Sequence, residues 1–163
     1  MINGILKRTR RYINSKKKVF IGSFELSLPL GHQLPIYLNE HKKYDQFLPF
    51  LVRFFGENEI VIDVGANCGD TLVAMAISNS RLKYVCIEPD HGFFEFLEEN
   101  IKAIKLQLPE LKIKSLKYFV GSEVDNVSLD GTGGTKHAVQ STNILWFDPI
   151  FLCFRNLSKM KGS

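Results

Sequence analysis

The sequence has few cysteines and no long apolar run, and each shortage excludes a class of protein. Its three cysteines, Cys68, Cys86 and Cys153, stand far apart in the 163 residues, which fits neither a disulfide framework nor a paired zinc motif. We expect reduced thiols and a cytoplasmic location. The longest nearly apolar stretch, residues 144–154, falls well short of the ~20 residues needed to cross a bilayer. We therefore expect no membrane span.

Acidic residues are missing from the first eighteen residues, which contain seven lysines and arginines. The other residues hold 14 basic and 17 acidic groups, a net charge of −3. This distribution argues against a folded body that binds nucleic acid, because such binding needs lysine and arginine clustered over the folded surface. We interpret residues 1–18 as a basic arm that is a solvated terminus. The alternative is that this arm contacts an anionic surface. No apolar core follows the arm, so a secretory signal is not expected.

The remaining chain has the size and the apolar content, 45%, of one globular domain. Apolar residues alternate with others over residues 24–30, which predicts a half-buried strand with Pro29 at its edge or end. Phenylalanines at helical spacing over residues 47–55 predict a helix that Asp45 caps and Gly56 ends. We expect residues 19–56 to form a strand and helix layer that packs against a main sheet.

Residues 57–143 alternate short apolar runs with helical patterns. The runs cover residues 60–64, 84–87 and 116–120, and the first looks buried on both faces, as in a central parallel strand. One helix is expected over residues 70–78, and a longer one between a cap at Asp90 and Pro109. This order predicts an α/β fold, a Rossmann-like, doubly wound parallel sheet with right-handed crossovers.

Acidic residues stand at the ends of the first two predicted strands, where open parallel sheets bind ligands. Asp63 precedes a loop in which Gly65 and Gly69 remove side chains where a ligand would approach the backbone, and the next helix points N–H groups at the same space. Glu88 ends the second strand, nineteen residues beyond Gly69, where a carboxylate accepts both hydroxyl protons of a ribose. We expect a nucleoside-containing ligand here.

A dinucleotide is the competing ligand, but its G-x-G-x-x-G fingerprint needs glycine where this chain has Asn67. The charge of Asp63 also repels a pyrophosphate and suits a cationic amine or sulfonium. We therefore favour S-adenosylmethionine and keep the dinucleotide-binding Rossmann protein as an alternative.

The segments VIDVGANCGDT, CIEPD and HGFFEFLEENI resemble the FkbM-type family of S-adenosylmethionine-dependent methyltransferases, as does LPLGHQLPIYLNEHKKYDQFL upstream. The resemblance covers residues 24–143. It implies a methionine moiety surrounded by Asp63, Gly65, Ala66, Asn67 and Gly69, a ribose held by Glu88, and an adenine bordered by Pro89 and Asp90. It also implies a polar contact to the adenine edge from Ser122 and Glu123.

The resemblance implies methylation of a hydroxyl on a sugar or another small molecule, without a metal. It identifies no general base. The four histidines show no metal spacing, and we interpret them as surface residues, with His137 beside the glycines of residues 131–134 as the one candidate base. We interpret Cys68 as a small packing residue.

The resemblance stops near Asn143, and the acidic strand motif resembling IKIDVEG that the family carries later is missing. We hypothesise a truncated or frameshifted member, incomplete at its C-terminus, with residues 144–163 as an atypical apolar and basic tail. A catalytically inactive remnant that binds the cofactor is then an alternative to an enzyme. Such a chain would expose one sheet edge and would self-associate through it.

Overall fold

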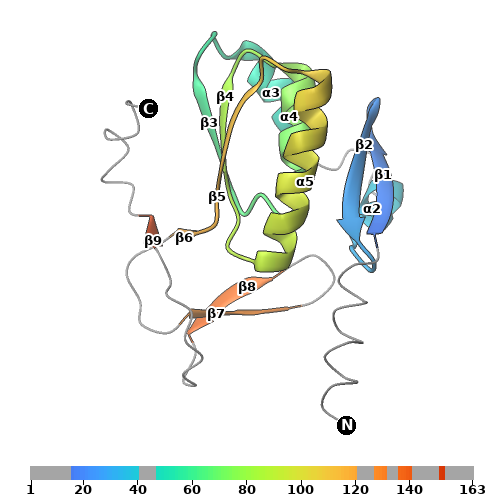
Figure 1. Cartoon of the computed structure of the whole chain (residues 1–163), viewed down its shortest axis with the longest axis vertical. Coiled ribbons are helices and arrows are strands. Elements are labelled where there is room, and N and C mark those ends of the chain that lie inside the picture. Colours follow the sequence, from blue (N-terminus) through green and yellow to red (C-terminus); the bar gives the residue numbers. More distant parts are fainter. Residues whose placement is uncertain (1–15, 41–46, 121–126, 132–135, 141–150, 153–163) are drawn as a thin grey trace.

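The computed structural model describes residues 16–40, 47–120, 127–131, 136–140 and 151–152, and Figure 1 shows their arrangement. The elements are β1 (Lys16–Ile21), β2 (Phe24–Pro29), α2 (Leu34–Glu40), α3 (Phe47–Leu51), the 3-10 turn η1 (Val52–Phe54), β3 (Ile60–Val64), α4 (Asp70–Ser78), β4 (Lys83–Ile87), α5 (His91–Gln107), β5 (Lys112–Leu116), β6 (Phe119–Val120), β7 (Val127–Asp130), β8 (His137–Gln140) and β9 (Phe151–Leu152). No described helix is long and apolar enough to span a membrane.

A parallel sheet in the order β3-β4-β5 is the centre of the fold. The helices α4 and α5 connect its strands and lie on the same face of it (Figure 1). The alternation of strands and helices predicted from the sequence is therefore confirmed, and α4 has the predicted bounds. The carboxylate of Asp90 accepts the backbone N–H of Phe93 at 2.9 Å, which confirms Asp90 as the cap of α5.

The third strand of this sheet lies earlier than predicted. We expected it at residues 116–120, but β5 covers Lys112–Leu116, and Phe119–Val120 form the separate strand β6, which pairs with β9. The sequence KIKSL escaped notice because two exposed lysines alternate with half-buried residues, as suits a strand at a sheet edge. Gly121, the predicted end of the strand, lies outside the described residues.

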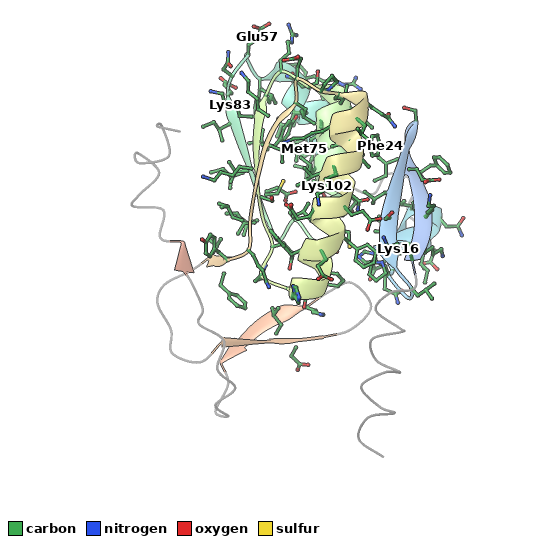
Figure 2. All side chains as sticks on the ribbon, viewed as in Figure 1. Lys16, Phe24, Glu57, Met75, Lys83 and Lys102 are labelled. Carbon is green, nitrogen blue, oxygen red and sulfur yellow. The ribbon has the colours of Figure 1, made fainter. Side chains whose placement is uncertain are left out.

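The antiparallel hairpin β1–β2 forms a third layer, outside the helices (Figure 1). The strand predicted at β2 is confirmed, with Phe24, Leu26 and Leu28 buried and Pro29 as its last residue. The hairpin packs on α5 and α4, and Phe24 lies between β2 and α5 (Figure 2), so our expectation that this layer contacts the sheet is wrong for the hairpin. The reason is that α4 and α5 already cover that face of the sheet.

The basic segment predicted as a solvated arm contributes to this hairpin. Three of its lysines, Lys16–Lys18, open β1 opposite Ser27–Pro29 of β2. Two of them reach acidic partners, because Lys16 pairs with Glu99 of α5 and Lys18 with Glu25 of β2. Residues 1–15 lie outside the described part of the chain.

The helix predicted over residues 47–55 forms as α3 followed by η1, and both contact α4. Its phenylalanines do not face the core. Phe47, Phe50 and Phe54 are exposed, and Val52 is the buried residue of this segment. The predicted cap, Asp45, lies outside the described residues.

The strand β3 is not buried on both faces, contrary to our prediction for it. Ile60 is 59% and Val64 54% exposed, and β4 is the only strand paired with β3 in the described part of the sheet. Part of the core lies between the sheet and the helices, where Met75 of α4 is buried (Figure 2), as is Tyr84 of β4, and the buried residues of β2 extend the core on the other side of the helices.

Candidate functional site

The site lies at the carboxyl ends of β3 and β4. Residues 65–69, here called the glycine loop, connect β3 to α4. The loop is fixed to β4 because the backbone N–H groups of Gly65 and Ala66 both donate to the carbonyl of Ile87, at 2.8 and 3.0 Å. Gly69 donates back to Ala66 at 2.8 Å, which closes the turn. These bonds hold the glycine loop against the end of the neighbouring strand.

The two glycines of the loop serve different purposes. Both have positive φ angles, 79° at Gly65 and 88° at Gly69, which favour glycine. A side chain at Gly65 would meet nothing within 4 Å, so this position is open to a ligand. A Cβ at Gly69 would stand 2.9 Å from the Leu97 side chain of α5. Gly69 therefore lets helix and loop pack closely.

Asn67 also has a positive φ, 50°, which asparagine tolerates better than most residues. Its side-chain oxygen Oδ1 accepts the backbone N–H of Cys68 at 2.8 Å. The same oxygen lies 3.0 Å from Nε2 of His32, in the turn after β2. The glycine loop thus contacts a residue of the N-terminal layer, the name used here for residues 16–40 with β1, β2 and α2.

Glu88 connects the two strand-end loops. Its Oε2 accepts the backbone N–H of Asn67 and its Oε1 that of Asp90, both at 2.8 Å. The backbone N–H of Glu88 itself donates to Leu116 of β5 at 3.0 Å. The residue is only 5% exposed. The carboxylate has therefore a fixed orientation between the loops after β3 and β4.

Burial raises the pKa of the Glu88 carboxyl above its ordinary value of 4.5. The two backbone N–H groups from Asp90 and Asn67 act in the opposite direction, and so does the charge of Lys136, but burial has the larger effect. The protein thus holds this carboxylate where its negative charge is costly unless further donors reach it.

Asp63 and Glu88 lie at the carboxyl ends of neighbouring strands. Asp63 pairs in register with Cys86, and Glu88 is the first residue after β4, which ends at Ile87. Burial, together with the nearby charge of Asp63, raises the pKa of the Cys86 thiol. Asp63 is half-buried, and its Oδ2 atom is inaccessible to solvent. The two predicted acids therefore flank the glycine loop from neighbouring strands.

Asp90 has a cationic partner in addition to its role as a helix cap. Its Oδ2 pairs with Lys136, the residue just before β8, and the lysine Nζ lies 4.8 Å from the ring centre of Phe93. These contacts bring Lys136 to the N-terminus of α5. Pro89, between the two acids, is half-buried.

The structure shows two further residues that sequence reasoning missed. Asn100 of α5 is 1% exposed, and its Nδ2 donates to the carbonyls of Cys68 and Ser27 at 2.8 and 2.9 Å. Its Oδ1 accepts the N–H of Ser27 at 2.8 Å. An asparagine within the apolar stripe of a helix was the signal that could have revealed it.

The second missed residue is His32, which we interpreted as a surface histidine. It is half-buried, and its imidazole contacts the glycine loop. His91 fits our interpretation better, because its side chain is 71% exposed and its Nε2 lies 3.5 Å from the exposed carboxylate of Glu95.

Other predicted residues are placed as follows. The side chain of Ala66 is buried in the core, so only its backbone is available to a ligand. Cys68 and Cys86 are buried free thiols, and burial raises the pKa of the Cys68 thiol, which confirms it as a packing residue. Ser122, Glu123, Gly133, Gly134 and Cys153 lie outside the described residues. The backbone of His137 is described in β8, but its side chain is not.

Comparison with known proteins gives structural similarities only. No protein-family profile matches the chain, and no curated protein matches it. An S-adenosylmethionine-dependent methyltransferase from Agrobacterium tumefaciens is similar over 64% of this chain, with 12% identity and a TM-score of 0.47. YjhP from E. coli is similar over 51%, with 17% identity and a TM-score of 0.36.

A third solved structure, the plantazolicin methyltransferase BpumL in complex with SAH, is similar over 52% of this chain, with 16% identity and a TM-score of 0.34. The similar regions cover 32%, 33% and 32% of these three proteins, so this chain spans about a third of their length.

Proposed function

We propose that this chain binds S-adenosylmethionine at the glycine loop and acts as a methyltransferase of the FkbM type on a small-molecule hydroxyl, such as that of a sugar. The observation that supports the proposal is the pair of acids at neighbouring strand ends: Asp63 precedes a loop that is open at Gly65, and Glu88, just after β4, accepts a hydrogen bond from the same loop.

Glu88 suits a ribose. Each carboxylate oxygen has two lone pairs, and a backbone N–H occupies one on each oxygen. One acceptor position per oxygen therefore stays available, which matches two neighbouring hydroxyl groups. Such donors would also offset the cost of burying the charge.

Asp63 suits the methionine moiety of the cofactor. A carboxylate attracts the sulfonium or the amine of the methionine moiety, whereas it would repel the pyrophosphate of a dinucleotide. The backbone of the glycine loop, from Gly65 through Asn67, lies between the two acids and would line the same moiety. Pro89 and Asp90 would border the adenine, with Ser122 and Glu123 as further contacts.

When bound, the cofactor supplies an activated methyl group, so the protein needs to align the acceptor and receive its proton. Asp63 and Glu88 would fix the methionine moiety and the ribose, the two parts of the donor that flank its sulfonium, which sets the direction of the methyl group toward the acceptor. The free thiols of Cys68 and Cys86 support a cytoplasmic location for this reaction.

Titration calorimetry with S-adenosylhomocysteine tests the binding. We expect saturable uptake by the wild type and an affinity about 10- to 100-fold lower for Glu88→Ala, because hydrogen bonds to a charged group are lost. Glu110→Ala removes an exposed carboxylate at the other end of the sheet and should bind like the wild type. Uptake of a nicotinamide dinucleotide instead would favour the alternative fold interpretation.

Transfer of a labelled methyl group to sugar acceptors then separates an enzyme from a binding remnant. Binding of S-adenosylhomocysteine with no transfer to any acceptor would support the catalytically inactive alternative.

A further inference from the structure

His32 is held in one orientation by contacts on three sides. Its Nδ1 accepts the backbone N–H of Leu34 at 3.1 Å, and its Nε2 lies 3.0 Å from Oδ1 of Asn67. Its ring stands edge-to-face with that of Phe93, with centroids 5.8 Å apart and planes at 76°. The imidazole is therefore fixed between the N-terminal layer, the glycine loop and α5.

These contacts determine which nitrogen carries the proton. The Asn67 atom facing His32 also accepts the N–H of Cys68, so it is the amide oxygen. An oxygen needs a donor, so Nε2 must be protonated. Nδ1 must then be bare in the neutral ring, and it accordingly accepts the N–H of Leu34.

A continuous path runs from this histidine to the carboxylate of the site. His32 Nε2–H donates to the Asn67 side chain, and the Asn67 backbone N–H donates to Oε2 of Glu88. Asn67 has a positive φ, so its conformation depends on such contacts more than that of an ordinary residue.

We propose that His32 is a positioning residue of the cofactor site, which acts through Asn67 to hold the glycine loop and Glu88 in the binding geometry. This inference rests on the function proposed above. The N-terminal layer would then contribute to the cofactor site, because His32, between β2 and α2, would hold the conformation of the glycine loop after β3.

Nitrogen NMR of the imidazoles tests the geometry without any ligand. At neutral pH we expect the Nε2–H tautomer at His32, assigned by the loss of its signals in His32→Phe. The exposed ring of His91 is an internal reference that lacks this arrangement. A Nδ1–H tautomer, or a ring that averages like His91, would overturn the inference.

Two variants test the role in binding. His32→Phe keeps an aromatic ring against Phe93 but removes the donor, and His32→Gln keeps a donor near the position of Nε2. We expect an affinity for S-adenosylhomocysteine about 5- to 10-fold lower for His32→Phe and within about 2-fold of the wild type for His32→Gln, since one hydrogen bond is at stake. His91→Phe is the matched control and should bind like the wild type.

Circular dichroism melting shows whether each variant is folded. If His32→Phe is not folded, the affinity of His32→Gln and the tautomer of His32 in the wild type still test the inference. Wild-type affinity in His32→Phe, or equal losses in both variants, would overturn the inference. The wrong tautomer with normal ligand uptake would contradict the inference alone. The Nε2–H tautomer with no uptake by the wild type would contradict the proposed function and, with it, the role of His32 in binding.

Discussion

Asn67 combines two properties that neither glycine nor alanine has together. It tolerates the positive φ of 50°, and its Oδ1 accepts hydrogen bonds from Cys68 and His32. A glycine here would supply the second glycine of the dinucleotide fingerprint, whose third position is occupied by Asp70, but it would remove both contacts. The asparagine is therefore a structural reason for the departure from that fingerprint.

Replacing Asn67 separates these two properties. Asn67→Ala should lower the free energy of unfolding by about 1–2 kcal/mol more than Asn67→Gly, because only alanine is strained in the left-handed region. Both variants should bind S-adenosylhomocysteine less tightly, because both lose the contact with His32. Urea denaturation and calorimetry give the two quantities. Equal destabilisation by both substitutions would contradict the backbone part of this argument.

The ionisation of Glu88 should couple to ligand binding. Its pKa is raised by burial in the free protein, and ribose hydroxyls would favour the charged form, so binding should lower that pKa. The chain should then release protons on binding at pH values above 4.5 where the free carboxyl is still protonated, and its affinity should increase as the pH rises through that range.

Calorimetry in buffers of different ionisation enthalpy measures the number of protons released. Glu88→Gln has no carboxyl group and should show no such release. Proton uptake by the wild type in this window would contradict the proposed contact between Glu88 and the ribose.

Sequence patterns located the two acids of the site but not the residues that hold them. Asp63 and Glu88 stand out because they stand at the ends of apolar runs, and the structure has these ends on the paired parallel strands β3 and β4. His32 and Asn100 could not be inferred in the same way, because they are 35 and 32 residues from their partners Asn67 and Cys68. A contact of that range depends on how the layers pack.

At the scale of elements, α5 organises the site. Its N-terminus carries Asp90, its middle accommodates Gly69 beside Leu97, and Asn100 joins it to both β2 and the glycine loop. The helix was predictable because its cap, its apolar stripe and Pro109 agree. The strand β5 was misplaced because an edge strand with exposed lysines has no continuous apolar run.

Asn100→Leu should destabilise the fold strongly. Leucine has a similar size, but it would leave the carbonyls of Ser27 and Cys68 and the N–H of Ser27 without this amide partner. We expect a loss of about 3 kcal/mol or more in the free energy of unfolding, because each buried polar group left unsatisfied costs about 1–3 kcal/mol. Thermal or urea denaturation measures it.

Asn39→Leu is the matched control for Asn100→Leu, because Asn39 is exposed on α2. It should leave the stability within about 0.5 kcal/mol of the wild type. A comparable effect of the two substitutions would contradict the structural role of Asn100.

At the scale of the whole molecule, the sheet is covered unequally. Its helices cover one face, while Ile60 and Val64 of β3 are exposed and β3 pairs only with β4 in the described part of the chain. Parallel strands are usually buried on both faces, and an open edge favours pairing with another chain. This arrangement supports the prediction that the chain self-associates through β3.

Sedimentation of the wild type should therefore show dimers or larger oligomers at micromolar concentration. The double variant Ile60→Lys, Val64→Lys should shift the chain toward monomers, because it places charges on an edge strand, beside the side chains of any strand that pairs with it. Leu106→Lys is the control, because it replaces a residue of α5 that is 86% exposed and far from β3 in sequence. A stable wild-type monomer would contradict the prediction.

The most direct test of the account is a crystal structure of the chain with S-adenosylhomocysteine. We expect both ribose hydroxyls at about 2.5–3.0 Å from the oxygens of Glu88, and the methionine end of the ligand beside Asp63 and the glycine loop. A ligand bound elsewhere, or bound with its ribose away from Glu88, would contradict the central claim that these two carboxylates grip one nucleoside.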